Sequence, residues 1–152
     1  FVKAIIKHIN NHQIGYFCIY KEFLMTKEYQ NHTSEQLVEA VVNGMLERKA
    51  QEITIIDLKN ITTAVCSYFV ICHGSSNTQV EAIAESVGME AQLKLNDRPT
   101  HVEGAQLAEW ILSDYVDVVV HVFQEESRRF YNLEELWADA EISTVKESMT
   151  NN

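Results

Sequence analysis

Apolar residues recur at helical spacing in two segments of the chain. The first follows Thr33, and Gln36 three residues later completes a capping box, so the pattern predicts a helix from there to about residue 49. The second follows Ser76, with Gln79 in the matching position, and predicts another helix. The apolar positions of this second helix are Val80, Ile83, Ala84, Val87 and Leu93.

Short apolar runs between and after these helices predict strands. They cover residues 53–58, 68–72, 100–103, 110–112 and 117–123. The run from Tyr68 to Cys72 is apolar at every position, which is typical of a central strand buried on both faces. The last two strands are joined by a short turn and should form an antiparallel hairpin. Residues 125–131 and 133–140 predict short C-terminal helices.

Together these elements predict one α/β domain, a mixed β-sheet flanked by helices. The length of 152 residues suits one domain with a real core. We assign the domain to residues 33–141 and a polar C-terminal tail to residues 142–152. Residues 1–32 form an N-terminal extension, non-native or disordered in this interpretation. It is either sequence upstream of a start at Met25 or an appended element.

The charge is acidic and uneven along the chain. Residues 1–32 hold four basic and two acidic groups, whereas the remainder holds eight basic and 20 acidic groups. An acidic body is poorly suited to the phosphate backbone, so direct sequence-specific nucleic-acid binding is not expected. A basic protein partner is the natural complement. The alternative is that the negative charge only keeps the protein in solution.

The cysteine and hydropathy patterns bear on where in the cell the protein is located. Cys18, Cys66 and Cys72 are odd in number and form no C-x-x-C pair, so neither a disulfide framework nor a zinc site is predicted. No apolar run reaches 18 residues, so we expect no membrane association. A cytoplasmic location follows as an expectation.

An enzymatic alternative rests on the glycine and serines after the second strand. Gly74 precedes Ser75 and Ser76 at a strand-to-helix junction, as in nucleotidyltransferases. Such enzymes also need paired carboxylates to hold divalent metal, because two metals clamp the attacking and leaving oxygens. Asp117 has no acidic neighbour two residues on, and Asp114 lies across the turn. A tight turn with a helix cap explains the segment more simply.

The six histidines do not assemble a metal or catalytic site by their spacing. His121 alternates with Val119 and Phe123 on one strand, which predicts a core or edge histidine. We therefore predict no catalytic residues, no metal and no cofactor.

The strongest local feature is a stretch without basic residues. No lysine or arginine lies between Arg98 and Arg128, and Trp110 stands in the middle. An aromatic residue ringed by acids fits an interface hot spot for a basic partner, or else a core residue beneath a solvated acidic face. The acids of this stretch are Glu103, Glu109, Asp114, Asp117, Glu125 and Glu126.

Several segments, in order, resemble the ribosomal silencing factors, also called the Iojap-related family. The similarity covers about residues 34–141. The joint occurrence of these segments is far more specific than any one of them. They are residues 68–80 (YFVICHGSSNTQV), Glu103-Gly104, residues 110–114 (WILSD), residues 117–123 (DVVVHVF) and residues 126–137 (ESRRFYNLEELW).

The resemblance implies a fold similar to nucleotidyltransferases without their catalytic carboxylates, and a role that is not enzymatic. Family members dock on the fourteenth protein of the large ribosomal subunit (uL14), block joining with the small subunit and so repress translation. Organellar members assist large-subunit assembly, and free bacterial members often form homodimers. The residues that we expect to bind the partner are Glu103, Trp110, Leu112, Asp114, His121, Glu125, Glu126, Arg129 and Tyr131.

Three positions depart from the family pattern. Ser67 stands where the family commonly has Asp, and His73 where it has Ser or Thr. Val116 stands where it commonly has Gly, so the turn must either avoid a positive φ or tolerate strain.

Overall fold

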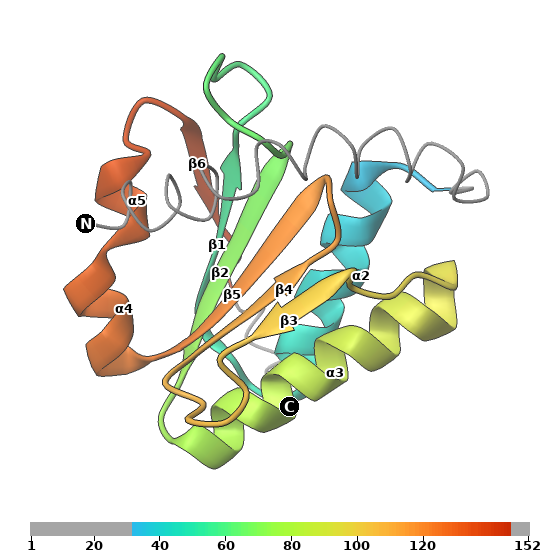
Figure 1. Ribbon diagram of the computed structural model, residues 1–152, viewed down its shortest axis with the longest axis vertical. Helices are drawn as coiled ribbons and strands as arrows, with labels where there is room; N and C mark the ends of the chain where they lie inside the picture. Colours follow the sequence, from blue (N-terminus) through green and yellow to red (C-terminus); the bar gives the residue numbers. More distant parts are fainter. Residues whose placement is uncertain (1–31, 147–152) are drawn as a thin grey trace. The chain divides into compact units, whose positions relative to one another are not determined.

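A computed structural model describes residues 32–146 of the chain. They form a mixed six-stranded sheet with the strand order β3-β4-β5-β2-β1-β6 (Figure 1). The predicted N-terminal extension lies outside the described residues apart from His32. The strands are β1 (Gln51–Asp57), β2 (Tyr68–Gly74), β3 (His101–Glu103), β4 (Trp110–Asp114), β5 (Val118–Gln124) and β6 (Glu141–Thr144). The helices are α2 (Ser34–Glu47), α3 (Asn77–Leu95), α4 (Glu125–Tyr131) and α5 (Leu133–Leu136).

The α/β fold class and the mixed sheet are confirmed, as is the antiparallel hairpin of β4 and β5. β2 is buried at every position and pairs in parallel with β5, as expected for a central strand. The capping box of Thr33 and Gln36 forms at the start of α2. At α3, Ser76 caps the helix, but the Gln79 side chain accepts instead from the N–H and hydroxyl of Ser75.

Helices α2 and α3 cover one face of the sheet (Figure 1). The core between these helices and the sheet is mostly aliphatic. Alternate residues of each strand contribute to it, because successive side chains of a strand point to opposite faces of the sheet. At Gly44 in α2, an added Cβ would lie 2.7 Å from the Val87 Cα, so only glycine permits this close approach of the two helices. The strand residues of this core include Val70, Cys72, Ile111, Val118, Val120 and Val122.

The opposite face of the sheet is covered only in part. Helix α4 packs on β5 and β2, and Trp137, just after α5, stands edge-on to Phe69 of β2 with ring centroids 5.6 Å apart. Over β4 the side chains of Trp110, Leu112 and Asp114 stay partly exposed. The β3–β4 side of this face is therefore open to solvent.

The C-terminal region differs from the prediction. Residues 141–144 pair with β1 as an antiparallel edge strand, where a polar tail from residue 142 was predicted. All four residues are exposed, so they carry little of the hydrophobic alternation from which strands are predicted. Their order comes from backbone pairing with β1. The second C-terminal helix is also shorter than the predicted 133–140, because α5 ends at Leu136.

The turn between β4 and β5 places a β-branched residue in the left-handed region. Val116 has φ 79°, and it occupies the first position of a two-residue hairpin loop closed by the Tyr115 N–H donating to the Val118 carbonyl at 2.9 Å. Hairpin turns with a positive φ at this position strongly favour glycine. The Val116 N–H donates to the Asp114 carboxylate at 2.7 Å, which helps to hold the turn. The turn therefore tolerates strain.

Replacing Val116 by glycine should stabilise the protein. The left-handed conformation costs a residue with a Cβ about 1–2 kcal/mol. Glycine raises the conformational entropy of the unfolded chain, which offsets about 0.4–1 kcal/mol of that gain. We expect a net gain of about 0.5–1 kcal/mol in the free energy of unfolding, measured by urea titration. Val65→Gly is the control, since Val65 is also exposed but has no positive φ. That variant should lose stability, and a loss in Val116→Gly as well would contradict the strain.

Candidate functional site

The open sheet face brings together residues from β3, β4 and β5. The register places Glu103 beside Leu112, and Leu112 beside His121. In the neighbouring row Trp110 lies beside Phe123. Cross-strand partners share a face of the sheet, so these side chains form one surface. The loop that returns β3 to β4 passes through Gly104, where φ is 83° and a Cβ would overlap the Trp110 carbonyl.

Trp110 is the centre of an aromatic cluster. Its ring stacks on Phe123 and meets Tyr131 of α4, each at a centroid distance of 4.8 Å. Its indole N–H donates to Nδ1 of His121 at 3.2 Å. Trp110 is thus neither a fully buried core residue nor a free surface residue. The ring is held by aromatic contacts and stays partly exposed, an arrangement suited to a rigid binding platform.

His121 supports Trp110 from within. The histidine is 1% exposed, so it cannot itself contact a partner, contrary to its inclusion among the predicted binding residues. Because Nδ1 accepts from Trp110, the neutral ring carries its proton on Nε2, which has no hydrogen-bond partner among the described residues. Burial lowers the pKa of His121 to about 3. The ring therefore stays neutral at physiological pH.

This burial predicts a loss of stability in mild acid. The folded-state pKa of His121 lies below its unfolded value of 6.5, so the unfolded chain binds the extra proton and stability falls as the pH drops through 6.5. Between pH 7 and pH 5 the loss should be about 2 kcal/mol from this residue. Urea titrations at both pH values measure it. In His121→Gln, which keeps an acceptor for Trp110, the difference between the two pH values should shrink by that amount; an unchanged difference would contradict the assignment.

The acids around this face have different roles. Asp114 is half-buried and its carboxylate accepts from the Val116 N–H, so it holds the turn; burial raises its pKa. Glu103 is exposed and pairs with His101 at 2.7 Å. Glu125 and Glu126 are exposed in the first turn of α4, where Glu125 forms an ion pair with Arg129. Glu103 on β3 and Glu125 and Glu126 on α4 are thus the exposed acids of the two elements that flank the aromatic cluster.

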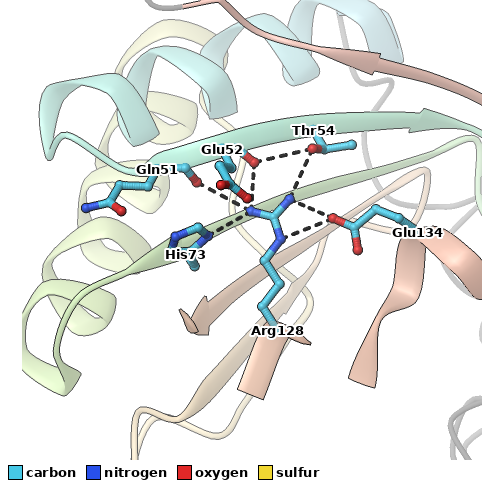
Figure 2. A network of polar contacts seen from close by, with 6 residues as sticks. All are labelled: Gln51, Glu52, Thr54, His73, Arg128 and Glu134. Carbon is cyan, nitrogen blue, oxygen red and sulfur yellow. Dashed lines mark hydrogen bonds and ion pairs between the residues drawn. The ribbon is translucent and has the colours of Figure 1, made fainter. Parts of the chain in front are cut away.

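A buried arginine fastens α4 and α5 to the sheet (Figure 2). Arg128 is 7% exposed, and its guanidinium donates to the Glu134 carboxylate at 2.6 Å and to the Thr54 hydroxyl at 3.1 Å. It also donates to the Glu52 carbonyl at 2.7 Å and to Nδ1 of His73 at 3.0 Å. Four elements therefore meet at one side chain.

The backbone acceptors of Arg128 arise from a bulge in β1. Gln51 pairs with His73 and Thr54 with Ile71, so β1 has one residue more than β2 over this interval. Glu52 has φ 48°, and its carbonyl turns toward Arg128. The His73 ring must be neutral to accept from Arg128, and burial together with the arginine charge lowers its pKa. At this position His73 serves as a structural acceptor.

The geometry rules out the enzymatic alternative built on the serines and aspartates. Ser75 and Ser76 follow the last residue of β2, whereas Asp114 and Asp117 lie near its start, where the Asp117 carbonyl accepts from the Tyr68 N–H at 3.1 Å. A seven-residue strand separates the two groups by about 20 Å. These residues cannot form one site. Among the described residues, no three His, Cys, Asp or Glu side chains are grouped to hold a metal ion.

Two residues of this region were not predicted. The sequence does not show which of the adjacent arginines Arg128 and Arg129 is buried. The one available signal is that Arg128 lies three residues before Tyr131 and so shares its side of α4. Phe130 is 80% exposed beside Tyr131, and an exposed phenylalanine looks like a core residue in sequence.

None of the helices within residues 32–146 has the length and hydropathy of a membrane span.

Comparison with known proteins identifies the family to which this fold belongs. The model of the family described as "Ribosomal silencing factor during starvation" matches residues 31–152. The chain belongs to this ribosomal silencing factor family. The match begins one residue before the described body.

The matches to relatives in the silencing factor family cover most of each relative's length. The ribosomal silencing factor of Halalkalibacterium halodurans is 39% identical over 108 residues, 71% of this chain and 91% of that protein. That of Bacillus subtilis is 40% identical over 99 residues, 65% of this chain and 82% of that protein. A crystal structure from Bacillus halodurans matches with a TM-score of 0.62 and 37% identity, covering 74% of this chain and 99% of that chain.

Proposed function

We propose that this chain represses translation by binding the large ribosomal subunit through its uL14 protein, where it blocks joining with the small subunit. Family membership and the names of the relatives support a silencing role. The observation that carries the docking surface is the partly exposed Trp110, held in an aromatic cluster between two elements that bear exposed acids, β3 with Glu103 and α4 with Glu125 and Glu126. The mechanism is occupancy, so it requires binding but no catalysis or cofactor. The protein acts in the cytoplasm and pairs as a homodimer when free.

The surface suits a basic protein. Its exposed acids offer opposite potential, which speeds encounter and disfavours acidic partners. The predicted binding residues that face outward are Glu103, Trp110, Leu112, Glu125, Glu126, Arg129 and Tyr131. Asp114 lies on the same side of β4 and is also partly exposed, but its carboxylate is engaged with the Val116 N–H. His121 is buried and supports this surface from beneath.

A role in assembling the large subunit is the second candidate. The mouse relative named "Mitochondrial assembly of ribosomal large subunit protein 1" is 28% identical over 66% of this chain and 44% of that protein. An assembly factor would use the same docking surface. The two roles differ in whether binding to mature subunits prevents their joining.

Sedimentation with separated ribosomal subunits tests the proposal. The tagged protein should be recovered with the large subunit and not with the small subunit. Adding it to a mixture of both should reduce the fraction of joined ribosomes. Recovery with large subunits without any effect on joining favours assembly, and recovery with neither subunit overturns both roles.

A further inference from the structure

We infer that Phe130 is the projecting anchor of the docking surface, and that it inserts into an apolar recess bordered by basic residues on the protein partner. This inference rests on the proposed function. It assigns the insertion to a residue outside the predicted set, with Trp110 as the platform beside it.

Phe130 projects from a rigid base. It is 80% exposed, although burial is the usual state of phenylalanine. Its neighbour two residues earlier, Arg128, ties α4 to β1, β2 and Glu134 by charge-assisted hydrogen bonds. An aromatic side chain on a fixed backbone loses little conformational entropy on binding. This favours an anchor over an incidental exposed ring.

The ring continues the aromatic surface of the sheet. Phe130 meets Tyr131 edge-on at a centroid distance of 5.1 Å, and Tyr131 meets Trp110 at 4.8 Å. Trp110 is in turn held by Phe123 and His121, which limits how far it can enter a partner. The most exposed aromatic ring therefore lies at the α4 end of the surface, and the most constrained one lies on β4.

Charge defines what surrounds the recess on the partner. Glu126 lies four residues before Phe130 and so shares its side of α4. Within residues 32–146, no ion pair involves the Glu126 carboxylate, whereas Glu125 is engaged with Arg129. An exposed acid beside an apolar knob fits an apolar recess with a lysine or arginine at its edge.

The test compares Phe130→Ala with Leu93→Ala, measuring affinity for purified large subunits and thermal melting of each variant. Leu93 is also 80% exposed, but it lies on α3, which covers the other face of the sheet. Phe130→Ala should bind at least about 10-fold more weakly with an unchanged melting temperature. Leu93→Ala should match the parent in both measurements. Glu126→Gln should bind more weakly at low salt, with the difference shrinking as salt rises.

Each outcome decides the inference. Normal binding by Phe130→Ala, with Trp110→Ala impaired, overturns the anchor but leaves the proposed function standing. Equal weakening by Leu93→Ala also overturns it, because the effect would then follow lost apolar area anywhere on the surface. Failure of the parent to bind large subunits overturns the anchor together with the proposed function. Selective weakening by Phe130→Ala with a parental melt supports it.

Discussion

Replacing Arg128 by methionine is expected to lower the free energy of unfolding by about 2–3 kcal/mol, the scale of losing hydrogen bonds to a charged group whose partners can be partly rehydrated. The Glu134 carboxylate, the Thr54 hydroxyl and the Glu52 carbonyl would lose their donor, and water can replace it only in part because the Glu134 side chain is 25% exposed. Methionine fills much of the volume, so the loss reports the polar contacts and not a cavity. Urea unfolding followed by circular dichroism measures it.

Arg129→Met is the matched control, since it removes the next arginine on the same helix. Its ion pair with Glu125 is exposed, and exposed pairs of this spacing contribute about 0.3–0.5 kcal/mol. Arg128→Lys should fall between the two, because a lysine cannot reach Glu134, Thr54 and the Glu52 carbonyl together. Equal stability of the Arg128→Met and Arg129→Met variants would show that the network is not structural.

The regular parts of this fold were accessible from sequence because their signals are local. The capping box at Thr33 and the fully apolar β2 each reflect one element and its own burial. The hairpin of β4 and β5 followed from two adjacent runs and a short connection. β6 gave no such signal, since its four exposed residues are ordered by pairing with β1.

The site was predictable in outline but not in its roles. Trp110 and the acids could be chosen because a stretch without lysine or arginine is visible in sequence. Whether Trp110 was core or surface depended on how far α4 reaches over the sheet, which sequence does not give. The burial of His121 and Arg128 likewise depends on packing between segments distant in the chain.

At Val116, by contrast, the sequence alone indicates an unusual turn, because the residue departs from the family pattern. A valine at a position commonly held by glycine implied either a different turn or strain. The positive φ of Val116 identifies strain. His73 was less informative, since its use as an acceptor for Arg128 depends on a bulge that the sequence of β1 does not reveal.

Replacing Trp110 by alanine is expected to weaken binding to the large subunit by more than about 30-fold, because truncating a central interface tryptophan commonly costs about 2 kcal/mol or more. The same change removes the contacts with Phe123, Tyr131 and His121, so the folded protein should also melt at a lower temperature. Affinity must therefore be measured well below the melting transition, with the folded fraction set by circular dichroism.

Trp137→Phe separates the two effects. Trp137 is buried against Phe69 on the covered part of the same sheet face, so this change should lower the melting temperature without altering the docking surface. Its folded fraction should bind large subunits with parental affinity, whereas folded Trp110→Ala should not. Glu125→Lys should slow association and reduce its dependence on salt, since exposed charges act mainly through encounter. A Trp110→Ala protein with a near-parental melt and undiminished binding would refute both the docking role and the structural role of this residue.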